Sequence, residues 1–195
     1  MDSFAKTRRR ILGRALAFCL CGVFCSIALT RAAAGAESAS EYQVKAVFLL
    51  NFTRFVQWPP EAFATPNEPF VIGILGNDPF GPRLDEVIRN ERIGEHPLVV
   101  HRFRTPEELG DCQMLFIALS DGPTIARVIA GLHHRSVLTV SEADAAAEHG
   151  AMIQLATESG HIRLRINVDA AHTAGLVISS KLLHLAEIVG TRPGD

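Results

Sequence analysis

The chain has 195 residues, of which 48% are apolar, and carries 19 basic and 21 acidic side chains for a formal net charge of −2. That length suits one domain with a substantial core. The balance of charge argues against a nucleic-acid-binding protein, because recognition of nucleic acid needs a basic face.

Residues 1–36 are predicted to be a cleavable signal peptide. Arginines at 8–10 precede an apolar run over 15–29, which is short for a membrane span. Small residues follow, and cleavage after Ala34 or Ala36 fits a secretory signal. An uncleaved membrane anchor is the alternative interpretation. The motif TRRRIL near the start also resembles a twin-arginine export signal, with general secretion as the other route.

Residues 37–195 are predicted to form the single folded domain. The leader holds six of the 19 basic and one of the 21 acidic side chains, which leaves 13 and 20 and a net charge of −7. Cys112 is the one cysteine in this part. The count excludes an intramolecular disulfide, a C-x-x-C redox centre and a cysteine-based zinc site. Because an apolar run follows Cys112, we interpret it as a buried thiol.

The domain opens on a predicted helix over residues 42–58, ended by Pro59 and Pro60. At 100° per residue its apolar side chains cover most of the circumference, so the helix is expected to be largely buried. Its narrow polar arc is predicted to hold Thr53, Arg54 and Gln57, with Leu50 between them. Asn51 falls inside the apolar arc and needs a hydrogen-bond partner if it is buried.

Strands and helices are then predicted to alternate. Four apolar, β-rich segments are predicted strands: 69–76, 97–103, 114–119 and 136–141. Four intervening segments are predicted to contain helices: 77–90, 105–109, 120–132 and 142–150, the last ended by Gly150. This alternation is typical of a mainly parallel sheet with helices on both faces.

The C-terminal part changes pattern. Residues 151–168 read as two strands around a turn, predicted to form an antiparallel hairpin at the sheet edge. Asp169 is predicted to cap a short turn, and Ser179 or Ser180 to cap a last helix with Leu182, Leu185, Ala186 and Val189 on one side. The predicted fold class is therefore α/β: a single domain with a mainly parallel central sheet and a C-terminal antiparallel hairpin.

Signatures of catalysis are weak in this sequence. It has no G-x-S-x-G elbow, Walker A loop or G-x-G-x-x-G motif, and its histidines do not show metal-ligand spacing. We therefore predict no catalytic residues, metal or cofactor. A small-ligand crevice is one interpretation of the loop after the first predicted strand, with Asn77, Asp78, Phe80 and Gly81. Ordinary turn chemistry is the other.

Six segments, taken in order, resemble the YfiR-like periplasmic family. They are YQVKAVFLLNFTRFVQWP, FVIGILGNDPFG, CQMLFIALS, VLTVSE, GAMIQL and IRLRINVDAAHTAGLVISSKLLHLA. Each is weak alone, but the order and the preceding secretory signal make the resemblance specific, and it covers residues 41–189. The family identification extends to the whole predicted domain, 37–195.

The resemblance implies a periplasmic regulator without enzymatic activity. Such a protein binds the periplasmic sensor domain of an inner-membrane diguanylate cyclase and holds the cyclase inactive, which lowers cyclic di-GMP and biofilm formation. The resemblance also implies an outer-membrane lipoprotein as a sequestering partner. The best-known member uses paired cysteines, whereas here only Cys112 stands at a family cysteine position. An intermolecular disulfide through Cys112 would require an exposed thiol.

A binding protein needs an apolar surface with polar anchors, and two segments supply candidates. We predict partner contacts, or a homodimer contact, at Asn51, Arg54 and Trp58 of the first helix and at Ser179, Ser180 and Lys181. A core helix with one solvated stripe and a serine-capped corner is the alternative for these segments. The functional alternatives are a small-ligand-binding module of another membrane signalling system and an enzyme.

Overall fold

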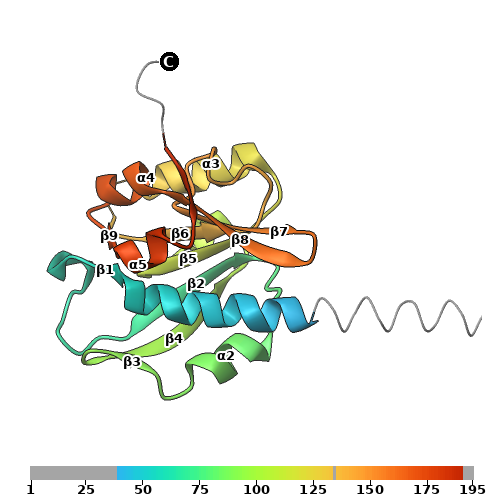
Figure 1. Cartoon of the computed structure of the whole chain (residues 1–195). Coiled ribbons are helices and arrows are strands. Elements are labelled where there is room, and N and C mark those ends of the chain that lie inside the picture. Colours follow the sequence, from blue (N-terminus) through green and yellow to red (C-terminus); the bar gives the residue numbers. More distant parts are fainter. Residues whose placement is uncertain (1–38, 134, 191–195) are drawn as a thin grey trace, which may run out of the picture. The chain divides into compact units, whose positions relative to one another are not determined.

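The computed structural model describes residues 39–133 and 135–190 (Figure 1). The chain divides into two compact units, residues 1–42 and 43–195. The described part of the first unit, 39–42, is helical, and the predicted signal peptide lies outside the described residues. The architecture below is that of the second unit. Within the described ranges, no helix combines the length and apolar character needed to cross a membrane.

The second unit is built on an eight-stranded sheet in the order β10-β8-β7-β6-β5-β2-β4-β3. The strands β2, β4, β5, β6 and β7 are mutually parallel, β8 runs antiparallel to β7, β10 is parallel to β8, and β3 is antiparallel to β4. Their bounds are β2 Phe70–Gly76, β3 Arg92–Ile93, β4 His96–Phe103, β5 Met114–Ala118, β6 Leu138–Ser141, β7 Ile153–Glu158, β8 His161–Asn167 and β10 Glu187–Val189.

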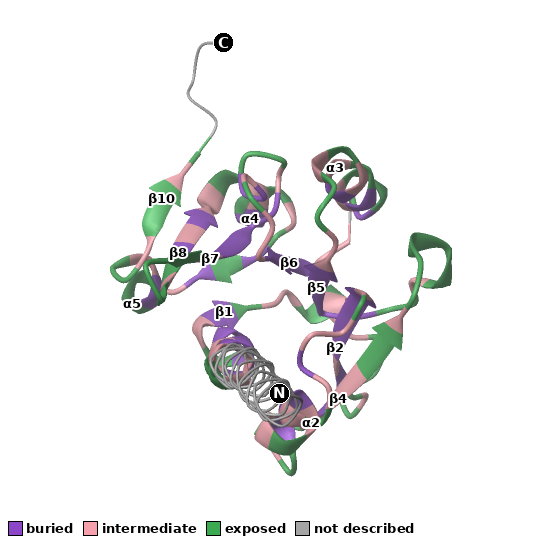
Figure 2. Cartoon of the chain, turned by 90° about the vertical axis from the view of Figure 1, so that its right-hand side faces the viewer, coloured by how far each residue is buried: buried purple, intermediate pink, exposed green. Residues whose placement is uncertain are grey.

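Helices cover both faces of this sheet (Figures 1 and 2). Residues 43–55, called the first helix from here on, lie with α2 (Pro82–Ile88) on one face. On the other face lie α3 (Gly122–Gly131) and α4 (Val168–Thr173). The predicted fold class, α/β with a mainly parallel sheet, is confirmed. The antiparallel hairpin is also present as β7–β8, and β10 extends the sheet beyond it.

Apolar side chains pack between the sheet and each layer of helices. On the α3 side, Leu115 and Ile117 of β5 pack with Ile125 and Val128 of α3. On the other side the rings of Phe80 and Phe116 meet edge to face, with centroids 4.8 Å apart, and both are fully buried. The continuous apolar runs of the central strands follow from this burial on two faces.

The connection between β6 and β7 contains no helix, contrary to the prediction for residues 142–150. These residues form successive turns instead. Ala145 has a φ of 54° and Gly150 a φ of 96°, and left-handed residues interrupt a right-handed helix. The alanine-rich segment favours a helix, but the short 142–152 connection must lead from β6 to its parallel neighbour β7. This requirement overrides the helix propensity.

The first helix ends at Phe55, three residues before the predicted end at Trp58. Val56–Gln57 instead form β1, which pairs antiparallel with β9 (Val177–Ile178). The predicted polar arc is also partly wrong, because Thr53 is buried and its hydroxyl donates to the Leu50 carbonyl at 2.6 Å. A satisfied hydroxyl can be buried at modest cost, which periodicity alone does not reveal.

The C-terminal segment also differs from its prediction. Asn167, and not Asp169, caps α4, accepting from the Ala170 amide at 3.0 Å. Ser179 caps α5 as predicted, but α5 (Ser180–Leu183) is a single turn. The expected longer helix is replaced by β10, whose residues pair with β8. Two short 3₁₀ helices, η1 (Pro60–Ala62) and η2 (Pro106–Glu108), complete the fold.

Candidate functional site

The outward side of the first helix carries an apolar stripe that continues into polar side chains. Val44, Val47, Asn51 and Arg54 follow one another at spacings of three or four residues and therefore share one face. Val44 is 46% exposed and Val47 is 42% exposed, although both fall in a helix whose other apolar side chains are largely buried. We call these four residues the helix stripe. It combines apolar contact area with an amide and a guanidinium.

Arg54 is held in place at one end of the helix stripe. Its Nη2 donates to Glu91 Oε2 at 2.7 Å, and both side chains are exposed. Exposed ion pairs contribute little to stability, so this contact mainly orients the guanidinium. Asn51 is partly exposed, which removes the burial problem posed by its place in the predicted apolar arc.

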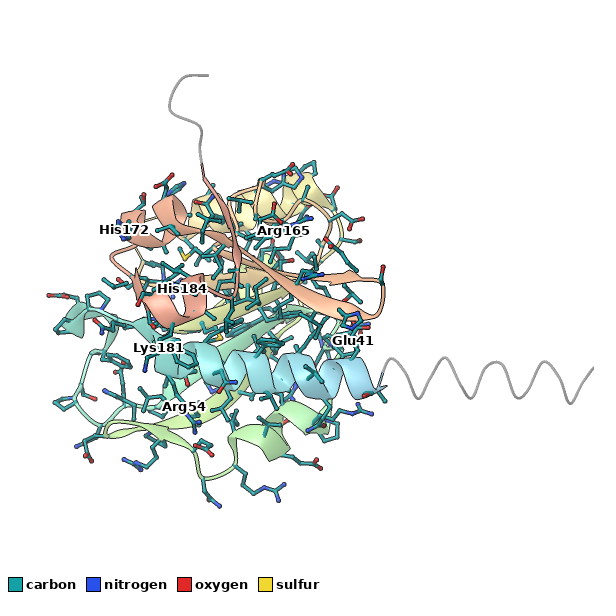
Figure 3. The ribbon with its side chains drawn as sticks, viewed as in Figure 1. Glu41, Arg54, Arg165, His172, Lys181 and His184 are labelled. Carbon is teal, nitrogen blue, oxygen red and sulfur yellow. The ribbon has the colours of Figure 1, made fainter. Side chains whose placement is uncertain are left out.

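The β1–β9 pairing brings together the two segments predicted to form the partner surface. Val56 pairs with Ile178, and the Ser179 amide donates to the Phe55 carbonyl at 2.8 Å. Ser180 and Lys181 are exposed directly after this pairing. In Figure 3, Lys181 and Arg54 lie on opposite sides of the helix axis near its C-terminal end. The structure therefore places the two segments beside each other without merging their side chains into one cluster.

Trp58 contributes to the interior more than the prediction expected. Its indole Nε1 donates to the Gln113 carbonyl at 2.9 Å, and its ring meets Phe70 edge to face at 4.8 Å. The side chain is half-buried. These contacts fix the chain where it leaves β1, and a role for Trp58 in partner binding stays a prediction.

Gln113 connects three parts of the chain next to Trp58, and sequence reasoning missed it. Its Oε1 accepts from the Val71 amide at 2.8 Å, and its Nε2 donates to the Ala62 carbonyl at 2.9 Å. The side chain thereby ties the segment after β1 to the start of β2. A polar residue directly before the buried strand β5 was the available signal, since buried amides need partners.

The predicted ligand crevice is a loop whose polar groups bond to one another. Asp78 Oδ1 accepts from the amides of Phe80 and Gly81, at 2.8 and 3.2 Å. Arg102 Nε donates to Asp78 Oδ2 at 2.7 Å, and Arg102 also binds Asp85. Phe80 is fully buried, while Asn77 is exposed. The geometry is that of a braced turn, and ligand binding there stays a prediction.

Arg102 shifts the titration of the carboxylate that it binds. Its side-chain hydrogen bond to Asp85 lowers the pKa of that carboxyl, against the smaller opposing effect of burial. The same hydrogen bond raises the pKa of Arg102. The pair therefore stays ionised and braces the loop between β2 and α2 at every ordinary pH.

Lys45 is a buried cation that sequence reasoning also missed. Only 2% of it is exposed, and its Nζ lies 2.5 Å from Glu142 Oε2. The pair joins the first helix to the beginning of the 142–152 connection. A lysine inside a helix with apolar residues over most of its circumference was the available signal, because a buried charge needs a partner.

Cys112 is buried, which confirms the predicted environment of this thiol. Burial raises its pKa to about 12, with a smaller opposing effect of Arg135 and a further increase from Asp111. A thiol that is both buried and protonated is a poor nucleophile. The folded domain therefore offers no accessible thiol at this position for the intermolecular disulfide considered above.

A family model described as YfiR/HmsC-like matches residues 42–187, which is most of the chain and nearly all of the described part. No curated protein sequence matches the chain.

Proposed function

Because the chain belongs to the YfiR/HmsC-like family, we propose that its exported part is a regulatory binding protein and not an enzyme. The proposed target is the periplasmic sensor domain of an inner-membrane diguanylate cyclase. Binding represses the cyclase, so that cyclic di-GMP and biofilm formation stay low. Family membership supports the class of function, and the assignment of the periplasm follows from the same family and from the leader sequence.

The observation that carries the proposal is the helix stripe. Val44 and Val47 are exposed to solvent, while neighbouring positions of the same helix are buried. Solvent-exposed apolar side chains that are contiguous, and bordered by polar groups, are typical of protein-binding surfaces. Arg54 at the polar end supplies the type of residue that often dominates binding energy. We propose that the sensor domain covers this stripe.

Two contacts support the rigidity of the proposed surface. Lys45 anchors the first helix near its N-terminal end to Glu142, and β1–β9 pairing holds its C-terminal end. A surface on a helix held at two points loses little conformational freedom on binding. Ser180 and Lys181, which follow β9, are proposed to contact the partner at the margin of the stripe.

The experiment compares two double variants in cells that lack the native gene. Val44→Glu with Val47→Glu should abolish repression, raise cyclic di-GMP to the level of the deletion strain and prevent capture of the cyclase from solubilised membranes. Glutamate is a good helix former, so the domain should stay folded. Circular dichroism and periplasmic abundance check folding.

The matched control is Leu185→Glu with Ile188→Glu. Both residues are exposed and apolar, at 75% and 52%, and the control adds the same charge outside the first helix. It should repress as the unmodified protein does. Full repression by the helix variant, or equal loss in both variants, would contradict the proposed surface. Capture of no cyclase by the unmodified protein would contradict the proposed partner.

A further inference from the structure

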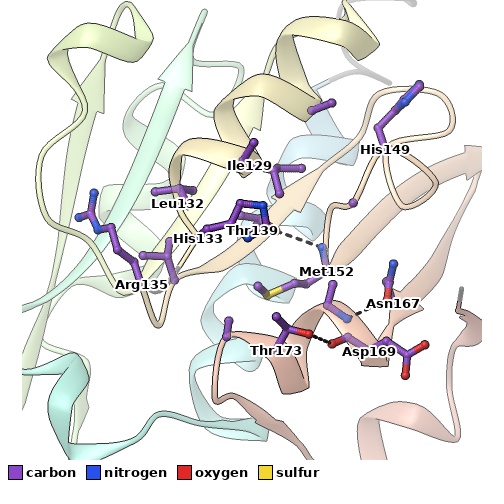
Figure 4. A pocket seen from close by; sticks show the side chains of 16 residues that line it. Ile129, Leu132, His133, Arg135, Thr139, His149, Met152, Asn167, Asp169 and Thr173 are labelled. Carbon is purple, nitrogen blue, oxygen red and sulfur yellow. Dashed lines mark hydrogen bonds between the residues drawn. The ribbon is translucent and has the colours of Figure 1, made fainter.

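A cavity of about 350 Å³ lies between α3 and α4, over β6 (Figure 4). Its apolar wall is formed by Ile129, Leu132, Val137 and Met152. This volume falls in the range of pockets that bind small molecules, roughly 300–1,000 Å³. None of the residues assigned to the proposed partner surface lines it.

The cavity exists because the sheet is left partly uncovered there. The 142–152 connection forms turns where a crossover helix was expected, so no helix fills the gap between α3 and α4. The two helices face this gap with small side chains, which are Ala126 and Ala130 of α3 and Ala170 of α4. Alanine at these positions leaves room that leucine would occupy.

The polar side chains around the interior already have partners within the domain. Thr139 Oγ1 accepts from the Met152 amide at 3.1 Å, and Asn167 caps α4. Thr173 Oγ1 donates to the Asp169 carbonyl at 2.9 Å. In Figure 4, the His149 ring and the Asp169 carboxylate point away from Thr139 and Met152. Arg135 and His133 also line the cavity. The Arg135 guanidinium is already bound by Asp111, with Nη2 and Oδ1 2.8 Å apart, and His133 is exposed to solvent. Away from these side chains the wall is mainly apolar.

From this arrangement we infer that the cavity binds a small, uncharged and mainly apolar molecule. The driving force is removal of apolar ligand surface from water, at about 25 cal/mol per Å². Charged molecules are disfavoured because they would lose hydration at the apolar wall, while the guanidinium of Arg135 is already paired with Asp111. This inference goes beyond the proposed function and does not depend on it, since it concerns another part of the domain.

The test uses purified residues 37–195 and two fluorescent probes that share one skeleton. N-phenyl-1-naphthylamine is uncharged, and 1-anilinonaphthalene-8-sulfonate adds a sulfonate. The uncharged probe should bind saturably with one site per chain, and the sulfonate probe at least about tenfold more weakly. Absence of saturable binding by the uncharged probe, or equal affinity of both probes, would overturn the inference.

Variants then locate the site. Ala126→Leu with Ala170→Leu fills the cavity and should weaken binding of the uncharged probe by about tenfold or more. His172→Leu places the same side chain on the exposed surface of α4, outside the cavity, and should leave binding unchanged. If the double variant folds poorly by circular dichroism, Ala130→Leu at an exposed lining position replaces it. If a variant folds, has leucine in the cavity and still binds the uncharged probe with unchanged affinity, the probe does not bind in this cavity and the inference is wrong.

Discussion

At the scale of single residues, the ion pair of Lys45 and Glu142 allows a prediction about stability. Lys45 is almost wholly buried, whereas the Glu142 side chain keeps 25% of its surface exposed. Removing one partner of a buried pair leaves the other charge without compensation, which costs more than the pair itself contributes. The two partners should therefore respond differently to substitution.

We expect Glu142→Gln to lower the free energy of unfolding by about 3 kcal/mol, because it removes the Glu142 carboxylate from the buried ammonium of Lys45. Lys45→Met should cost less, since an apolar chain of similar length fills the site and Glu142 can hydrate. Urea unfolding measures both. Arg165→Met, which breaks the exposed pairs with Glu158 and Glu187, is the control and should cost below about 1 kcal/mol. A cost for Glu142→Gln as small as that of the control would contradict this account.

Cys112 gives a second prediction at this scale. The thiol of folded residues 37–195 should not react with 5,5′-dithiobis(2-nitrobenzoate) at pH 8, and should react at once in denaturant, because burial holds it protonated. Between its ordinary pKa near 9 and the folded value of about 12, the unfolded chain loses a proton that the folded chain keeps. Stability should therefore fall as pH rises through this window.

The control for this pH dependence is Cys112→Ala, in which the decrease in unfolding free energy between pH 8 and pH 10.5 should be smaller. Rapid labelling of the folded protein at pH 8 would show that the thiol is accessible. An identical pH response of both proteins would show that Cys112 does not contribute to it.

At the scale of elements, the last strand closes one edge of the sheet. In β10, Glu187 pairs in register with Arg165 of β8, and the two side chains also form an ion pair with Nε and Oε2 3.1 Å apart. Without β10, the longer strand β8 would become the edge and expose its backbone donors and acceptors. The opposite edge is the short strand β3, with the exposed and charged Arg92.

Ending the chain after Ala186 should therefore destabilise the domain without preventing folding. Loss of three paired residues is worth about 2–4 kcal/mol, which corresponds to a melting temperature lower by roughly 5–15 °C. Differential scanning calorimetry measures the change. A chain ended after Gly190 keeps β10 and is the control. Equal melting temperatures for the two chains would show that β10 does not stabilise the sheet.

At the scale of the whole molecule, the leader and the domain differ in net charge. The predicted signal peptide is basic, while residues 37–195 carry a net charge of −7. An acidic domain is not attracted to anionic lipid, so binding at the membrane would rest on a specific partner. Family membership covers residues 42–187, which lie almost entirely in the second compact unit.

Export by the twin-arginine route is a prediction for this leader. Replacing the arginines at 8–10 by lysine should prevent appearance of the mature chain in the periplasm, because that route requires its arginine pair. Cell fractionation and immunoblotting measure the distribution, with an unrelated protein exported by general secretion as the control. Unchanged export of the variant would assign this chain to the general route.

The sequence by itself determined the fold class, the order of the central strands along the chain and the burial of Cys112. Those features follow from local patterns: continuous apolar runs, alternating strands and helices, and turn residues. The tertiary structure decided the features that depend on distant residues. The first helix ends at Phe55 because the following residues pair with β9. Glu187–Val189 form a strand because they pair with β8. Lys45 is buried beside Glu142, which lies far from it in the sequence.

The candidate partner surface was also predictable only in part from the sequence. Periodicity identified the helix and placed Arg54 on its polar arc, where the structure shows it exposed. It placed Asn51 inside the apolar arc, whereas the structure shows this residue partly exposed. Partner binding by either residue stays a prediction. It could not distinguish the exposed Val44 and Val47 from their buried neighbours, since valine has the same hydropathy on either face. Which face of an apolar helix meets the sheet is settled by packing against distant strands, and that information is not contained in the local spacing of side chains.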